Sequence, residues 1–163
     1  MRITKTFEYT APPQRVFAMM ADPAFQAAKC EATHPLEHSE AVTPKGDQTE
    51  IVTRRVVPTD GFPEFAKSMI GSKIAVTETI ILSRASIDGS RSGTVTIGIG
   101  DARVAMTGTI RLGPSETGTK VMIDGELKAK VPLFGGRIEK AAAPSVIEAI
   151  DREHETGIAW LSR

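Results

Sequence analysis

The C-terminal segment constrains the fold more than any other part of this chain. Residues from Val131 to Leu161 predict a short turn followed by one helix of roughly 25 residues, which spans about 40 Å at ~1.5 Å per residue. A long apolar stripe on such a helix must be covered by an equally long apolar surface, and only a curved sheet built from the preceding residues would provide it. The small and apolar residues that recur at spacings of three and four, and so form this stripe, are Ile138, Ala142, Val146, Ala149, Ile150, Gly157, Trp160 and Leu161.

Three features of this helix allow two interpretations each. Pro144 falls inside it, where a proline removes a backbone hydrogen bond and commonly causes a kink. The kink either follows the curve of the sheet or holds the helix off the sheet and keeps a cavity open. Trp160 is expected to anchor the helix end in the core, with stacking on a ligand as the alternative. Gly135 and Gly136 predict a tight turn, with a small anion site at the helix start as the alternative.

The residues before this helix predict an antiparallel sheet preceded by two short helices. Ile3 to Tyr9 alternates as a strand, Pro13 begins a helix, and Asp22-Pro23 begins a second helix that reaches about Cys30. From residue 34 to residue 131, apolar and polar residues alternate in about six further strands with short turns, which indicates a sheet with one covered face. A bend or a close backbone contact is expected at three glycines within these strands, Gly98, Gly108 and Gly125.

Length and charge narrow the class of protein. A chain of 163 residues suits one domain, residues 1–163, with a sizeable core. Its 20 basic and 20 acidic residues balance, which argues against a nucleic-acid partner. The single cysteine excludes an internal disulfide framework, and neither a signal peptide nor an apolar run of the ~20 residues that span a bilayer is visible. We expect a cytoplasmic protein without integral membrane association, either monomeric or weakly dimeric.

Four segments carry a resemblance to a known superfamily. They are ITKTFEYTAPPQRVFAMMADPAF at the start, PTDGFPEFAKSMIG in the middle, and VPLFGGRIEK and TGIAWL at the ends of the closing helix. With this order of elements the chain resembles the START-like, or SRPBCC, helix-grip superfamily, and within it a bacterial family of uncharacterised domains. The resemblance implies an α+β fold in which a seven-stranded antiparallel sheet grips the C-terminal helix around a cavity that often holds an apolar molecule. Relatives range from lipid carriers to polyketide cyclases, so the resemblance assigns no catalytic residue and no cofactor.

The expected cavity lining follows from which face of each strand is covered. A shift of one residue in register would move a strand's contribution to the other face. The residues expected to face the cavity are Phe7, Val76, Glu78, Ile97, Met106, Ile123, Ala142, Val146 and Ile150. Phe62, Phe65 and Met69 lie at helical spacing in a long connection between strands, where they either plug one end of the core or form a lid at the cavity mouth.

The polar candidates are few. Glu78 shares the register of its apolar neighbours, so it is either a buried acid or an acid in an ion pair near a sheet edge or at a solvated rim, and Arg55 is its nearest obvious counter-charge. His34, His38 and Glu40 would share one strand face, but separations of ~13 Å and more are too long for one metal ion, so we expect no metal and no other cofactor.

Two further reactive side chains are expected to have no chemical role. Cys30 has no histidine or cationic cluster near it in the sequence, so it is expected to be an inert buried thiol. His154, between Glu153 and Glu155, is expected on a solvated helix face.

These observations favour non-catalytic binding or transport of a small hydrophobic molecule, such as a lipid or polyketide. One alternative is a cyclase- or dehydrase-like enzyme that uses the same cavity with Glu78 and Arg55 as its polar groups. The other is a protein-interaction module with a filled core. An open cavity with several inward polar groups favours the enzyme, an open cavity with one or none favours the carrier, and a packed interior favours the module.

Overall fold

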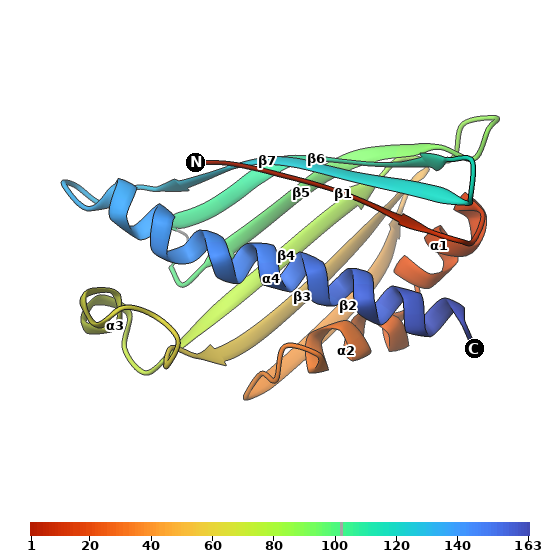
Figure 1. Ribbon diagram of the computed structural model, residues 1–163. Coiled ribbons are helices and arrows are strands. Elements are labelled where there is room, and N and C mark those ends of the chain that lie inside the picture. The colour runs from red at the N-terminus through yellow and green to blue at the C-terminus, as the bar shows by residue number, and fades with distance from the viewer. Residues whose placement is uncertain (102) are drawn as a thin grey trace.

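A curved antiparallel sheet wraps around one long helix in the computed structural model, which describes residues 1–101 and 103–163 (Figure 1). The strands are β1 (Arg2–Tyr9), β2 (Glu37–Lys45), β3 (Gln48–Pro58), β4 (Lys73–Leu82), β5 (Arg91–Ile99), β6 (Val104–Pro114) and β7 (Thr119–Ala129). The helices are α1 (Pro13–Met20), α2 (Pro23–Glu31), α3 (Glu64–Ile70) and α4 (Gly135–Leu161). This arrangement confirms the predicted α+β helix-grip fold.

The sheet is a meander to which the first strand is added at the end. Its spatial order is β1-β7-β6-β5-β4-β3-β2, and every neighbouring pair is antiparallel. Successive strands from β2 to β7 are therefore neighbours, while β1 pairs with β7 and leaves β1 and β2 as the two edges. Two of the three glycines expected at close contacts meet that expectation: a Cβ on Gly108 would lie 2.2 Å from the Asp124 carbonyl oxygen, and one on Gly125 would lie 2.9 Å from the Met106 side chain.

Helices α1 and α2 form at the positions that their prolines indicate. Pro13 and Pro23 each occupy the first turn, where a proline loses no hydrogen bond because the first amides of a helix have no partner within it. The Asp22 carboxylate caps α2 by accepting a hydrogen bond from the amide of Ala24 at 2.8 Å. The buried face of α2 includes Phe25 and Cys30, which are both 0% exposed.

Helix α4 runs across the concave side of the sheet and packs against β1 and β7 as well as against α1 and α2 (Figure 1). Gly157 permits this close approach, because a Cβ at that position would lie 2.5 Å from the Tyr9 hydroxyl oxygen. Near the helix end the Trp160 ring meets the Phe25 ring edge-on at 5.6 Å, as expected for a core anchor. Across the described ranges, no helix combines the length and the apolar character needed to cross a membrane.

Candidate functional site: two cavities beneath the C-terminal helix

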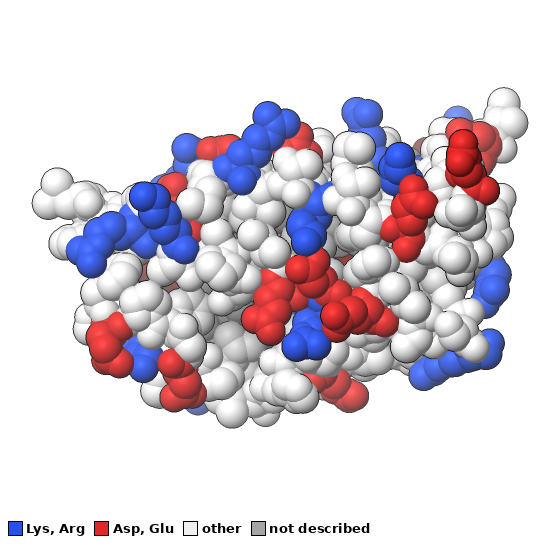
Figure 2. All heavy atoms as spheres, in the orientation of Figure 1, with Lys and Arg blue, Asp and Glu red and all other residues white. Residues whose placement is uncertain are grey.

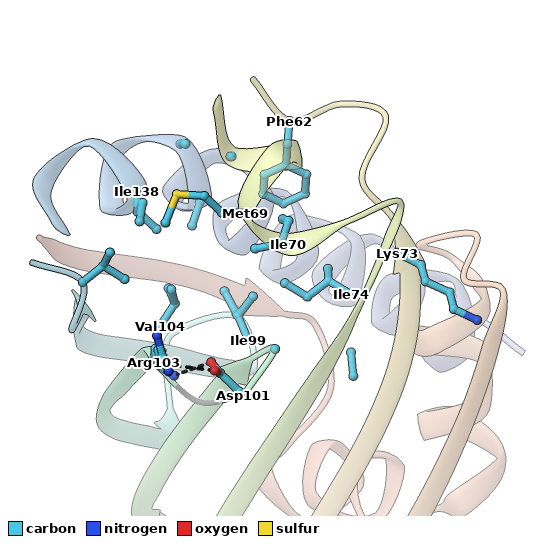
Figure 3. A pocket seen from close by; sticks show the side chains of 16 residues that line it. Phe62, Met69, Ile70, Lys73, Ile74, Ile99, Asp101, Arg103, Val104 and Ile138 are labelled. Carbon is cyan, nitrogen blue, oxygen red and sulfur yellow. Dashed lines mark hydrogen bonds and ion pairs between the residues drawn. The ribbon is translucent and has the colours of Figure 1, made fainter. Parts of the chain in front are cut away.

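The larger cavity has a volume of about 360 Å³ and lies between α3, the first half of α4 and one end of strands β4 to β6. The connection between β3 and β4, residues 59–72, contains α3 and is called the α3 segment below. In Figure 3, Phe62, Met69 and Ile70 lie above the cavity on this segment, and Ile74, Ile99 and Val104 line the cavity from the strands. Ile138 reaches the cavity from α4. Two of its charged residues, Asp101 and Arg103, are exposed and pair with each other at 3.1 Å. The interior of the larger cavity is therefore mainly apolar, with its charges at the rim.

The smaller cavity has a volume of about 260 Å³ and lies between the residues that follow α2, strands β3 to β5 and the middle of α4. The surface is hollowed between α3 and the middle of α4 (Figure 2). Three residues, Phe62, Ile74 and Ile99, line both cavities. The two cavities therefore share a wall. The other apolar residues of the smaller cavity include Val57, Val76, Ile97, Val146 and Ala149.

The α3 segment covers both cavities and is tied at its base. The Thr59 hydroxyl donates to the Gly71 carbonyl at 2.5 Å and the Thr59 amide donates to the Ser72 carbonyl at 3.0 Å, so the two ends of the segment are held together. Ala66 is the buried residue of α3, and Met69 is 50% exposed. A helix with one buried residue and a fixed base has the construction of a cover, which supports the lid interpretation.

Six residues of the predicted lining border at least one of these cavities: Phe62, Met69, Val76, Ile97, Ala142 and Val146. Three others, Met106, Ile123 and Ile150, lie in the packed core between sheet and helix. Phe65 lies on α3, and the guanidinium carbon of Arg137 lies 4.3 Å from the centroid of the Phe65 ring. Phe7 stacks on the imidazole of His154 at 4.6 Å between ring centroids.

The sequence predicted a solvated face for His154, whereas the structure shows a half-buried side chain. Its imidazole packs against Phe7 and Tyr9, and its Nε2 is 2.9 Å from the Glu8 carbonyl oxygen. The neighbouring Glu153 is also buried, with 6% exposure. The helix face that carries these two residues is turned toward β1 and the interior because α4 lies close against the sheet at its C-terminal half.

Three buried charges meet beside the cavities. The Lys29 ammonium lies 2.5 Å from a Glu78 carboxylate oxygen and 3.2 Å from a Glu153 carboxylate oxygen, and the three residues are 3%, 7% and 6% exposed. Burial lowers the pKa of Lys29, but the attraction of Glu153 and Glu78 outweighs burial and leaves that pKa above its usual value. The cluster joins α2, β4 and α4.

The two carboxylates respond to burial in opposite directions. Burial raises the pKa of Glu78, yet Lys29 and Arg55 reverse this and leave it below its ordinary value. Burial also raises the pKa of Glu153, and there Lys29 does not compensate fully, because the negative charge of Glu78 acts in the same direction as burial. Glu153 is therefore the acid of the cluster that holds its proton more firmly.

The counter-charge of Glu78 is thus Lys29, whereas the sequence had indicated Arg55. The two residues of the cluster that were not predicted, Lys29 and Glu153, each lie on a buried stripe of a helix. Lys29 follows Phe25 by four residues on α2, and Glu153 follows Ile150 by three residues on α4. A charged residue on an apolar stripe is a signal for a buried ion pair, although the sequence cannot show which partner it meets.

Arg55 occupies a different environment from the one expected. It is 6% exposed, lies directly opposite Val76 on the neighbouring strand and lines the smaller cavity. One of its terminal nitrogens donates to the Thr33 hydroxyl at 3.3 Å, and its Nε has no acceptor among the described residues. Within the same residues it takes part in no ion pair. Arg55 is therefore a buried cation that borders a largely apolar space.

A second group of side chains has the chemistry of a metal site. The sulfur of Cys30, a ring nitrogen of His38 and a carboxylate oxygen of Glu40 all lie within 4.8 Å of one another. These donor types bind zinc. Burial raises the pKa of the Cys30 thiol, however, which opposes the thiolate form that a metal requires, and His38 Nδ1 is already 2.9 Å from Glu40 Oε2. His34, which the sequence grouped with His38 and Glu40, lines the smaller cavity instead.

Fold and cavities together define a protein of the START-like helix-grip class. More particularly, the chain matches a family described as "Protein of unknown function (DUF2505)" over residues 4–161, and it belongs to that family. No curated protein matches the sequence.

Several solved structures share the fold. A Thermus thermophilus protein, TTHA0849, superposes with a TM-score of 0.62 at 16% identity, covering 98% of this chain and 95% of that one. A STAR-related lipid transfer protein fragment from Xanthomonas axonopodis gives 0.63 at 10% identity, covering 99% and 86%. Ara h 8.0201 gives 0.50 at 14% identity, covering 100% and 99%. At these identities the likeness concerns the fold, and it confirms the predicted START-like helix-grip fold.

Proposed function

We propose that this protein binds and carries a small hydrophobic molecule in the two cavities beneath α4. The observation that carries this proposal is the pair of adjoining volumes, about 360 Å³ and about 260 Å³, with mainly apolar walls and Phe62 common to both. Protein interiors normally contain few voids larger than a water molecule, whereas ligand pockets measure roughly 300–1,000 Å³. Unfilled, mainly apolar space of this size between the sheet and α4 is therefore suited to a ligand.

Two further observations support a carrier. The STAR-related lipid transfer protein from Xanthomonas axonopodis has the same fold at a TM-score of 0.63. The α3 segment covers the cavities with a helix in which Ala66 is the buried residue, so it is the part of the cover best suited to open for a ligand.

The alternative functions receive less support. A protein-interaction module with a filled core does not account for the cavities. A cyclase-like enzyme needs polar groups that converge on the substrate. Of the two groups expected for it, Arg55 lines the smaller cavity, but Glu78 is held by Lys29 and is absent from the described lining of either cavity, so the pair does not converge there. The charged pair of the larger cavity, Asp101 and Arg103, lies at its exposed rim. Binding without covalent chemistry therefore accounts best for the arrangement.

The test is binding of the neutral fluorescent probe N-phenyl-1-naphthylamine to variants in which each cavity is filled. Ala141 lines the larger cavity and Ala149 the smaller one, and both are half-buried, so phenylalanine at either position projects into space that is now empty. We expect Ala141→Phe or Ala149→Phe to weaken probe binding by about 10-fold or more, equivalent to about 1.4 kcal/mol.

The matched control is Ala159→Phe, which adds the same ring to an exposed position on the same helix. It should bind the probe as the wild-type protein does. Failure of the wild-type protein to bind the probe, or equal binding by all three variants, would refute the proposal. Native mass spectrometry of protein purified from its own host then identifies the molecule that co-purifies.

A further inference from the structure

Arg55 is a buried positive charge that lacks an anionic partner among the residues that the structure describes. Charged side chains are rarely buried unless they are paired, because removal of a charge from water is costly. Arg55 is 6% exposed, and its one hydrogen bond to a described side chain goes to the neutral hydroxyl of Thr33. A guanidinium carries five N–H donors, and the Nε of Arg55 is buried without an acceptor among the described residues.

The neighbouring acids do not meet this need. Glu78 and Glu153 both direct their carboxylates to the Lys29 ammonium, at 2.5 Å and 3.2 Å. The two carboxylates carry as much negative charge as Lys29 and Arg55 carry positive charge, but both carboxylates form their ion pairs with Lys29. Glu78 and Glu153 thus neutralise Arg55 only at longer range, and the guanidinium keeps free donors at the wall of the smaller cavity.

The surroundings of Arg55 have the two-part character of a site for an amphipathic molecule. Its guanidinium belongs to a cavity whose other walls include Val76, Ile97 and Val146. From there the apolar lining continues through Phe62, which borders the larger cavity as well. A polar head beside Arg55 would therefore have an apolar path for its tail.

We propose that Arg55 anchors the carboxylate of an apolar acid, with the head group in the smaller cavity and the hydrocarbon tail directed past Phe62 toward the larger one. This inference rests on the proposed function and specifies the ligand class. The planar fork of a guanidinium matches a carboxylate with two parallel hydrogen bonds.

The charges around Arg55 indicate a monoanion. Lys29, the other buried cation nearby, is already engaged by two acids. Arg152, at the rim of the same cavity, pairs with Glu148 and Glu155. One available cation matches a ligand with one negative charge better than it matches a phosphate dianion.

The experiment compares two ligands that differ only in the head group. Oleate and oleyl alcohol, each below its aggregation concentration, are used as competitors that displace the probe N-phenyl-1-naphthylamine, and the assay is run on the wild-type protein and on Arg55→Met. Methionine fills similar space without a charge. We expect the wild-type protein to bind oleate ~10-fold to ~100-fold more tightly than oleyl alcohol, the range of a charge-assisted hydrogen-bonded pair. Arg55→Met should lose this preference, because oleate binding weakens by about the same factor relative to oleyl alcohol.

Two controls keep the result interpretable. Arg54→Met removes the adjacent arginine of β3, which is exposed, and should keep the oleate preference. Arg55→Lys keeps a charge without the planar fork and should keep only part of that preference. The comparison of the two ligands in the wild-type protein needs no variant, so equal binding there overturns the anchor even if Arg55→Met does not fold, and Arg55→Lys then tests whether a preference depends on the guanidinium.

The outcomes separate this inference from the proposed function. If the wild-type protein binds both ligands equally, or if Arg55→Met keeps the preference for oleate, the anchor is overturned while the carrier function stands. If neither ligand displaces the probe and the probe itself does not bind, both are overturned.

Discussion

Replacement of Lys29 by methionine tests the buried charge cluster most directly. Methionine keeps most of the volume of the side chain but removes the ammonium that lies 2.5 Å from Glu78 and 3.2 Å from Glu153. Two carboxylates, each less than a tenth exposed, would then lose the cation that contacts both of them. Removal of one partner from a buried ion pair typically destabilises a protein by ~3–5 kcal/mol. For a domain of this length that loss lowers the melting temperature by about 6–20 °C.

The loss of stability in Lys29→Met should depend on pH, and the pKa values of the two carboxylates determine the direction of this dependence. In the wild-type protein burial raises the pKa of both Glu78 and Glu153, and Lys29 is the first cause that lowers it, ahead of the smaller effect of Arg55. Loss of Lys29 should therefore move the folded-state pKa of both acids upward, above the ordinary value of 4.5. The folded protein then binds protons that the unfolded chain releases, so stability falls as pH rises through the window above 4.5. We therefore expect Lys29→Met to be closer to the wild-type protein at pH 5 than at pH 8.

Urea unfolding followed by circular dichroism at both pH values measures these differences. Lys128→Met is the matched control, because its ammonium lies 3.1 Å from Glu126 on the surface and its side chain is 65% exposed. That variant should change the unfolding free energy by less than about 0.5 kcal/mol. The reasoning is refuted if Lys29→Met costs no more than this control, or if its deficit is the same at pH 5 and pH 8.

Two other substitutions examine single contacts. Glu153→Gln keeps an oxygen acceptor for Lys29 but removes the acid whose folded pKa is raised above 4.5. The stability of this variant relative to the wild-type protein should therefore increase between pH 5 and pH 8. Parallel pH profiles of the two proteins in urea unfolding would contradict the raised pKa. Gly157→Ala places a Cβ 2.5 Å from the Tyr9 hydroxyl oxygen and should cost ~1–3 kcal/mol in thermal unfolding. In an unobstructed helix alanine would instead stabilise by ~1 kcal/mol, so a rise in melting temperature would disprove the close contact.

The fold was predictable because its signals are local. The alternation of Lys73 to Leu82 gives the bounds of β4, and prolines 13 and 23 give the first turns of α1 and α2. The position of unfilled volume is not local. Ile97 and Met106 are paired directly across β5 and β6 and share one face of the sheet, yet Ile97 borders the smaller cavity while Met106 is fully buried in the core. Strand periodicity identifies the face, but only the path of α4 and α3 over that face decides where space is left.

The charge cluster illustrates the same limit over longer distances. Lys29 lies 49 residues from Glu78 and 124 residues from Glu153, so no spacing rule could join them. Each position was nevertheless marked by a charge on an otherwise buried stripe. The single-domain organisation, the monomeric or weakly dimeric state and the lack of a nucleic-acid partner stay predictions from composition.

Phe62 has a consequence for which molecules the protein can accept. Its ring belongs to the walls of both cavities and comes from the segment whose ends Thr59 ties together, not from the sheet. It is therefore the part of the shared wall that can move with the segment. Under the proposed function, a short ligand would fit one cavity, whereas a longer ligand would have to displace the Phe62 ring, so that the length of a ligand as well as its polarity would decide whether it binds.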